Sequence, residues 1–235
     1  DLVYDLKMAD KENEIHTTTG LEENGRNLYN RMTPAQKAAW DKHYDPIIKK
    51  FKEQKLTGKA LAEWKYQQYM HDYMRVIHSV DRNVGRVLDY MEKSGLLENT
   101  IIVYTSDQGF YMGEHGWFDK RFMYEESFRT PLIIRYPAKI KTGSECTALV
   151  QNIDYAPTYL DIAGIEKPDY MVGTSLVPLF GGETPRDWRE YLYYHYYDYP
   201  AIHMVRRHDG VRDSRYKLIH FYGEKNEHND AISCK

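Results

Sequence analysis

Apolar residues recur at helical spacing through the longest regular pattern in the chain. Between residues 59 and 93 they fall mostly three or four positions apart, at Trp64, Met70, Met74, Ile77, Val80, Val84, Val87, Leu88 and Met91. This spacing predicts an amphipathic helix with one apolar face. Gly95 follows and suits the position after a helix end. The pattern therefore predicts one long helix over residues 59–93.

A shorter helix upstream is predicted by its start signals. Thr33 is a preferred capping residue, Pro34 suits the first helical position, and Gln36 completes a capping box. Pro46 lacks a backbone donor and clashes with the preceding turn, so we expect the helix to stop or kink at about Asp45.

Continuous β-branched runs follow the long helix. Residues 100–105 and 132–136 predict short strands buried on both faces of a mostly parallel sheet. Residues 149–153 are a third candidate strand, leading into a helix at about 154–163 that ends on Gly164. This order of elements predicts an α/β fold.

The character of the chain changes to tyrosine-rich runs after about residue 185. Residues 190–196 and 216–222 flank the polar turn 213–215 and predict a small antiparallel sheet beside the main one. We therefore expect residues 1–185 to belong to the α/β domain and residues 186–235 to form an incomplete antiparallel subdomain.

Charge and chain ends limit the classes of function. The 235 residues carry a formal net charge of -3, so no global basic field favours nucleic acid or an anionic membrane. No apolar run is long enough for a transmembrane segment. The chain opens at Asp1 with neither an initiator Met nor a signal-type segment, so we expect a longer polypeptide with any signal peptide upstream.

Candidate chemistry begins directly after the first predicted strand. Asp107 and Gln108 offer two adjacent hard oxygen ligands, which suit Ca²⁺ or Mg²⁺, although the same residues also make an ordinary strand-to-loop turn. Sites in open α/β sheets form beyond the carboxyl ends of strands. The loop over residues 106–130 is longer than a mere connection needs and concentrates acidic, imidazole, ammonium and aromatic groups. It is therefore a candidate active-site loop.

The residues of this loop resemble a known family. Residues 104–120 read Y-T-S-D-Q-G-F-Y-M-G-E-H-G-W-F-D-K, similar to the sulfatase pattern T-S-D-[NHQ]-G…G-E-H-G…K. Later landmarks of the same family follow in the right order at residues 125–137, 152–164, 173–179 and 211–218. The chain thus resembles the C-terminal portion of a sulfatase of the alkaline-phosphatase-like superfamily, closest to those acting on glycosaminoglycan-type or other sulfated sugars. The resemblance implies a mixed sheet flanked by helices, with a small C-terminal antiparallel β subdomain.

The resemblance also implies roles for particular residues. Asp107 and Gln108 would be two ligands of a calcium ion, with Mg²⁺ less favoured. Lys120 would contact the sulfate group and offset its charge, which a compact ammonium does well, and the alternative is a solvated loop lysine. His115 would line the pocket, or hold the loop by a hydrogen bond.

Three further residues are candidate substrate contacts. His203, Arg206 and His208 lie in the tyrosine-rich region, where sulfatases of this type often place sugar-recognition loops. They could bind a carboxylate or sulfate of the substrate. A surface basic run beside a strand edge explains them equally well.

One signature of the family is missing. Sulfatases carry C/S-x-P-x-R, whose Cys or Ser becomes the formylglycine nucleophile, and neither Cys146 nor Cys234 stands in such a motif. We expect formylglycine upstream of this chain, and we expect this piece to be inactive alone. The resemblance implies a hydrolase acting on a sulfated carbohydrate in the periplasm, outside the cell or in lysosomes. The alternatives are a phosphodiesterase or phosphonate hydrolase of the same superfamily, and a non-catalytic glycan-binding or structural piece.

Overall fold

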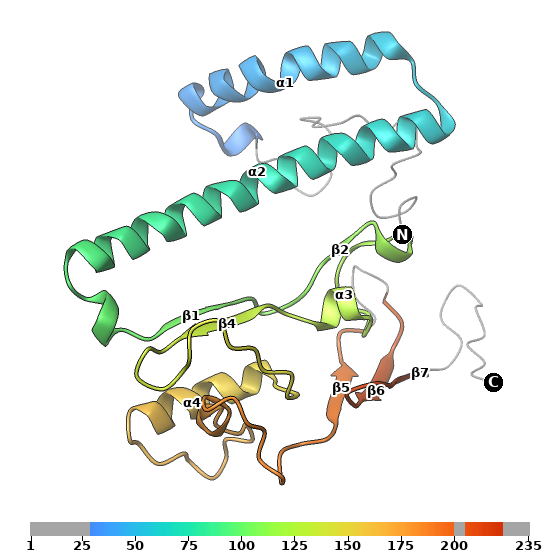
Figure 1. Cartoon of the computed structure of the whole chain (residues 1–235). Helices are drawn as coiled ribbons and strands as arrows, with labels where there is room; N and C mark the ends of the chain where they lie inside the picture. Colours follow the sequence, from blue (N-terminus) through green and yellow to red (C-terminus); the bar gives the residue numbers. More distant parts are fainter. Residues whose placement is uncertain (1–28, 200–204, 223–235) are drawn as a thin grey trace. The chain divides into compact units, whose positions relative to one another are not determined.

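The computed structural model describes residues 29–199 and 205–222, and the chain divides into two compact units. The first unit takes the chain up to Asp89 together with Met112–Phe118, and the second takes Tyr90–Tyr111 together with the chain from Asp119 onward. Figure 1 labels their helices and strands in sequence colours. No helix in the described ranges is both long and apolar enough to cross a membrane. The domain boundary at residue 185 stays a prediction.

The first unit is built on two long helices, α1 (Pro34–Gln54) and α2 (Gly58–Lys93), which runs on into the second unit (Figure 1). The long helix predicted at 59–93 is confirmed. The capping box of α1 is also confirmed, because the Gln36 N–H donates to Thr33 Oγ1 at 3.4 Å and the Thr33 N–H donates to Gln36 Oε1 at 2.9 Å. Helix α1 therefore begins where its local sequence signals place it.

The predicted end of the first helix at Asp45 is wrong, because α1 continues through Pro46 to Gln54. An interior proline removes a backbone hydrogen bond. Packing of the later turns offsets this loss, since the Phe51 ring lies 4.7 Å from the Trp64 ring of α2. The helix ends instead at Gln54, and its C-cap residue Lys55 has a left-handed φ of 47°.

The apolar face of α2 is exposed over much of the helix. Leu61 is buried near its start, whereas Met74 is 53%, Ile77 45% and Val87 58% exposed. These three side chains belong to the apolar face that the sequence spacing predicts for this helix.

In the second unit, β1 (Ile102–Thr105) pairs with β4 (Leu132–Arg135) in antiparallel register, Thr105 opposite Leu132. The prediction of a mostly parallel sheet is therefore wrong for this pair. A parallel pair needs a crossover connection, and the only α-helix between these two strands is the four-residue α3 (Glu125–Phe128). Tyr104 and Ile133 are 45% and 64% exposed, so within the described residues these strands are not buried on both faces.

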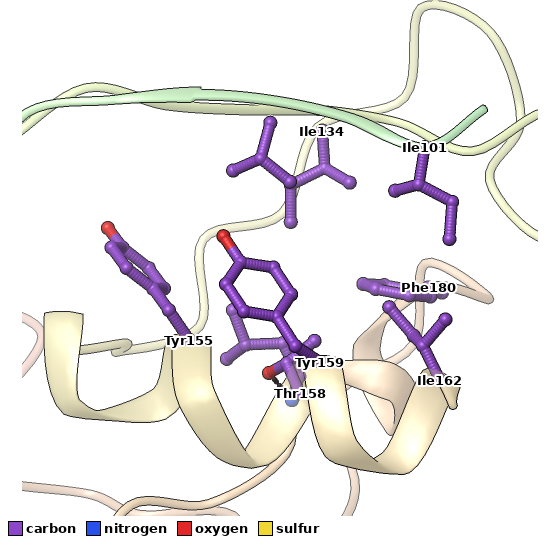
Figure 2. Close-up of a pocket in the computed structure, with 9 residues that line it drawn as sticks. Ile101, Ile134, Tyr155, Thr158, Tyr159, Ile162 and Phe180 are labelled. Carbon is purple, nitrogen blue, oxygen red and sulfur yellow. Dashed lines mark hydrogen bonds between the residues drawn. The ribbon is translucent and has the colours of Figure 1, made fainter. Parts of the chain in front are cut away.

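Helix α4 (Tyr155–Ile162) covers one face of this strand pair. Figure 2 shows Ile101 and Ile134 facing Thr158, Ile162 and Phe180 across a small apolar cavity. The core continues through Leu176 and Leu179. The helix predicted at 154–163 is thus confirmed, and its end at Gly164 takes a φ of 69°. This packing holds α4 against the β1–β4 pair within the second unit.

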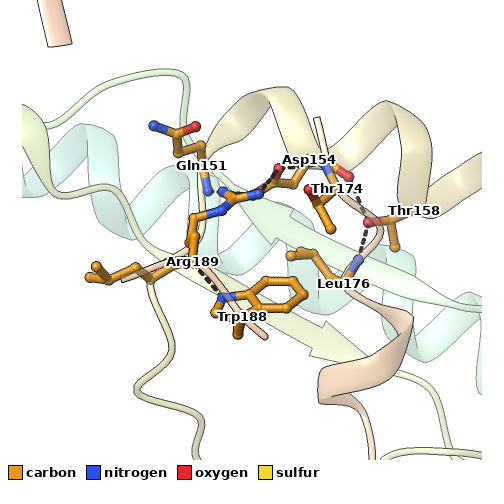
Figure 3. A network of polar contacts seen from close by, with 8 residues as sticks. Gln151, Asp154, Thr158, Thr174, Leu176, Trp188 and Arg189 are labelled. Carbon is orange, nitrogen blue, oxygen red and sulfur yellow. Dashed lines mark hydrogen bonds and ion pairs between the residues drawn. The ribbon is translucent and has the colours of Figure 1, made fainter. Parts of the chain in front are cut away.

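The third candidate strand, residues 149–153, is wrong: its end turns into a short 3₁₀ helix, Asn152–Asp154. The cause is Asp154, a fully buried carboxylate whose Oδ2 accepts from the Gln151 N–H at 2.8 Å. Figure 3 shows the network around it, in which Arg189 donates to both oxygens, at 2.5 and 2.7 Å. The Thr174 N–H donates a further hydrogen bond at 2.9 Å.

The C-terminal sheet has three antiparallel strands, β5 (Leu192–Tyr196), β6 (His208–Arg212) and β7 (Lys217–Phe221), in that order. The predicted antiparallel sheet is therefore confirmed. Strand β6 was not predicted, because Asp209-Gly210 at its centre is typical of a turn. Gly210 is required there, since an ideal Cβ would lie 2.4 Å from Met123 Sδ. Strands β2 (Tyr111–Met112) and β3 (Phe118–Asp119) form a further two-stranded sheet.

Candidate functional site

The candidate loop starts where β1 ends, and its two ends are tied together. Thr105 Oγ1 donates to the Pro131 carbonyl at 2.8 Å, just before β4. Asp107 is exposed and Gln108 half-buried. The Ser106 hydroxyl donates to the Gln108 carbonyl at 2.8 Å and lies 3.5 Å from Asp107 Oδ1. Ser106, which the sequence reasoning did not single out, thus shapes the turn that carries both side chains.

Gly109 lets this turn lie directly against α3. Its N–H donates to the Ser127 carbonyl at 2.9 Å, and an ideal Cβ would lie 2.1 Å from the Glu126 carbonyl oxygen. No side chain fits at that distance, so the identity of residue 109 is fixed by close backbone approach.

We expect Gly109→Ala in the full-length protein to lower the free energy of unfolding by about 1–3 kcal/mol, because the methyl group forces the backbone of α3 aside. Thermal and urea unfolding measure this loss of stability. The matched control is Gly85→Ala, where nothing lies within 4 Å of an ideal Cβ. There a stabilisation of about 0.5–1 kcal/mol is expected, since alanine favours a helix interior. Equal unfolding midpoints for the two variants would contradict the predicted clash.

Asp107 and Gln108 supply ligand atoms of the right type for a hard divalent cation, but too few of them to hold one. A carboxylate and an amide carbonyl are oxygen ligands of the type that Ca²⁺ and Mg²⁺ take, and Ca²⁺ takes about 6–8 of them. In residues 29–199 and 205–222 no group of three or more His, Cys, Asp or Glu side chains is placed to hold a metal. Two ligands could come from this turn, and the others would have to come from elsewhere.

Lys120 lies in the second unit and is half-buried. It stands between two non-glycine residues with positive φ, Asp119 at 75° and Arg121 at 108°. Such backbone conformations cost about 1–3 kcal/mol each and persist only where the surroundings enforce them. Arg121 forms an ion pair with Asp119 that bridges the lysine. This local geometry has no sequence signal, because neither flanking residue is a glycine.

His115 lies in the first unit, on the turn Glu114–Gly116 of the β2–β3 hairpin. Its φ is 57°, a left-handed conformation in which histidine is enriched among non-glycine residues. The imidazole is exposed, and its ring lies 5.9 Å from that of Trp117. The structure therefore places Asp107, Gln108 and Lys120 in one unit and His115 in the other.

The candidate substrate contacts have different surroundings. His208 is fully buried, and its ring stacks on Tyr196 at 5.2 Å and on Phe122 at 5.6 Å. Burial lowers the pKa of His208, and the hydrogen bond with the Arg206 carbonyl raises it only in part. This buried placement favours a packing role for the side chain. Arg206 is exposed, and His203 lies outside the described residues. Their roles as substrate contacts stay predictions.

Glu125, at the start of α3, joins the loop to the C-terminal sheet. Its carboxylate pairs with Lys217 and with Arg212, the latter at 3.5 Å. Burial alone would raise the pKa of Glu125, but the hydrogen bond and charge of Lys217, with the charges of Arg212 and Arg129, outweigh it and hold the pKa below its ordinary value. Both cations lie on β6 and β7.

Glu125→Gln should therefore destabilise the fold at neutral pH and not in acid. A carboxyl group with a depressed folded-state pKa contributes stability above its unfolded-state pKa, and this stability is lost as the pH falls through the folded-state value. We expect a loss of up to about 1 kcal/mol at pH 7, because the pair is partly exposed. The measurement is urea unfolding from pH 7 down to about pH 3, with the exposed Glu183→Gln as control. A difference that stays constant over this range would contradict the prediction.

Comparison with known proteins gives consistent matches over nearly the whole chain. The sulfatase family model matches residues 18–165, and the model for the C-terminal region of N-sulphoglucosamine sulphohydrolase matches residues 113–230. An N-acetylglucosamine-6-O-sulfatase of Bacteroides thetaiotaomicron is 53% identical over 95% of this chain. The chain spans only 40% of the length of that relative.

Solved structures also resemble this chain over most of its length. The structure of a protein in complex with its substrate D-glucosamine-2-N,6-O-disulfate matches with a TM-score of 0.81 and 51% identity, covering 95% of this chain and 45% of that one. A phosphonate monoester hydrolase from Silicibacter pomeroyi matches with a TM-score of 0.61 and 32% identity, covering 67% of this chain and 33% of that one.

Proposed function

The chain belongs to the sulfatase family, and from this premise we propose that it is part of an enzyme that hydrolyses sulfate esters of a carbohydrate. The observation that carries the proposal is the 53% identity to an N-acetylglucosamine-6-O-sulfatase over 95% of the chain. That identity includes the region of the candidate loop, so a sulfated amino sugar is the substrate class we favour. By the same reasoning we propose a location outside the cytoplasm.

Asp107 and Gln108 would hold one side of a divalent cation, for which we propose Ca²⁺. A cation there would offset the negative charge of the sulfate oxygens. Lys120 would bind the sulfate by charge and hydrogen bonding, and its stabilisation of the developing charge would be strongest in the transition state. The half-buried position of Lys120 supports this role, because partial exclusion of water strengthens the interaction of an ammonium with an anion.

The nucleophile would come from residues outside this chain. No C-x-P-x-R or S-x-P-x-R motif occurs in the 235 residues, so we propose that formylglycine and the remaining metal ligands lie in the rest of the protein. The chain by itself would then be inactive.

The test is sulfate release by the full-length protein from N-acetylglucosamine-6-sulfate, compared with hydrolysis of a phenylphosphonate monoester. The second substrate is included because of the structural match to a phosphonate monoester hydrolase. A preference for the sulfate ester supports the proposal, and a preference for the phosphonate would replace it. If neither substrate nor any aryl sulfate were turned over, a non-catalytic role would remain.

A further inference from the structure

Three successive backbone carbonyls directly after Lys120 each accept a hydrogen bond from a distant side chain. The Tyr194 hydroxyl donates to the Arg121 carbonyl at 2.9 Å. The Tyr111 hydroxyl donates to the Phe122 carbonyl at 3.2 Å, and Lys217 Nζ donates to the Met123 carbonyl at 2.7 Å. The donors come from β5, β2 and β7, and we call these three hydrogen bonds the carbonyl clamp.

Side-chain packing acts on the same segment. The Phe122 ring stacks on the buried His208 at 5.6 Å, and Met123 is fully buried against Gly210 of β6. The Arg121 N–H donates to Ser127 Oγ at 2.7 Å. Every residue from 121 to 123 is therefore held by at least one contact to another element.

The two tyrosine donors of the clamp stay protonated. Tyr111 is fully buried, and burial raises the pKa of its hydroxyl and also that of Tyr194. Both phenols therefore remain hydrogen-bond donors through the neutral range. Lys217 is held in turn by Glu125.

We propose that the C-terminal sheet is the positioning device for Lys120, with Tyr194 as its chief positioning residue. This inference rests on the proposed function, in which Lys120 binds the sulfate group. A lysine side chain is flexible, so its placement depends on where the backbone holds its Cα. The positive φ angles of Asp119 and Arg121 on either side are an arrangement that only an enforced backbone retains. The carbonyl clamp restrains the backbone on the C-terminal side of the lysine.

The test is a double-mutant cycle between Tyr194→Phe and Lys120→Ala in the full-length protein, read out as kcat/KM for an aryl sulfate. Tyr194→Phe removes one hydroxyl and keeps the ring that packs edge-on against Phe128 at 5.6 Å. We expect this variant alone to lower kcat/KM by about tenfold, mostly through kcat, since small misplacements of a binding group cost rate. In the Lys120→Ala background we expect less than a twofold further loss, because the two residues act as one unit.

The matched control is Tyr193→Phe on the same strand, whose hydroxyl contacts His195 at 3.2 Å and not the clamp. It should leave kcat/KM unchanged in either background. If Tyr194→Phe fails to fold, Ser127→Ala is the second variant, because it removes the hydroxyl that accepts from the Arg121 N–H. It should show the same coupling to Lys120. Thermal unfolding of each variant separates lost activity from lost protein.

The outcomes distinguish the two proposals. If Lys120→Ala retains full activity, the proposed role of Lys120 is wrong, and the positioning inference falls with it. If Lys120→Ala is impaired but Tyr194→Phe is fully active, or if the two losses multiply, only the positioning inference is overturned. Activity loss that follows the unfolded fraction would assign Tyr194 a purely structural role.

Discussion

Replacing Asp107 with alanine is expected to lower sulfate-ester turnover of the full-length protein by roughly a thousandfold, because the proposed cation site would lose its charged ligand. The fold should be unaffected. Asp107 is exposed, and surface substitutions change the free energy of unfolding by about 0.5 kcal/mol or less. This separation of activity from stability follows from the position of the side chain on a turn that other residues hold in shape.

Two measurements check this result. Steady-state kinetics gives the loss of turnover, and elemental analysis of the purified protein gives its calcium content, which should fall with the activity. Asp107→Asn tests whether the charge or only the oxygen is needed, and we expect it to be nearly as impaired as alanine. The control is Glu166→Gln, an exposed carboxylate outside the loop. Unchanged turnover in Asp107→Ala would refute the metal-ligand role.

The helices were predictable because their signals are local. Thr33, Pro34 and Gln36 act on one another within a single turn, and the apolar spacing of α2 needs no tertiary contact to be recognised. The direction of β4 was not predictable in this way. A continuous apolar run such as residues 132–135 fits a parallel or an antiparallel strand equally, and only the tertiary structure decides between them. The predicted helix end at Pro46 failed for the same reason, because tertiary packing between α1 and α2 stabilises the turns beyond the proline.

The candidate site also has a part that local sequence predicts and a part that only tertiary contacts reveal. Asp107 and Gln108 were singled out by their residue types after a predicted strand, and Lys120 by the resemblance to the sulfatase pattern; their roles stay predictions. The contacts that shape their loop come from far along the chain, Tyr194 lying 73 residues from Arg121 and Lys217 lying 94 residues from Met123. Tyrosine and lysine at these positions are also ordinary strand residues, so no sequence pattern singles them out. The structure alone connects the tyrosine-rich sheet with the sulfatase loop.

The largest effect on stability is expected at Arg189, which holds the buried carboxylate of Asp154 (Figure 3). Arg189→Ala should lower the free energy of unfolding by about 3–5 kcal/mol, because it leaves an uncompensated charge in the interior. Asp154 has no exposed surface, and its remaining partners, the N–H groups of Gln151 and Thr174, are dipoles without net charge. Urea unfolding of the full-length protein measures the loss.

The double variant Arg189→Met with Asp154→Asn tests whether charge is the cause. Removing both charges abolishes the buried unpaired carboxylate while the amide of asparagine can still accept from the Thr174 N–H, so the double variant should be more stable than Arg189→Ala. Lys59→Ala is the control for an exposed pair, since Lys59 is 89% exposed and 3.5 Å from Glu63, and it should cost about 0.5 kcal/mol or less. A double variant as unstable as Arg189→Ala would mean that the geometry of the arginine, and not its charge, holds the turn before α4. In that case the network would stabilise the fold mainly by cross-linking residues 149–154 to the segment at 188–189.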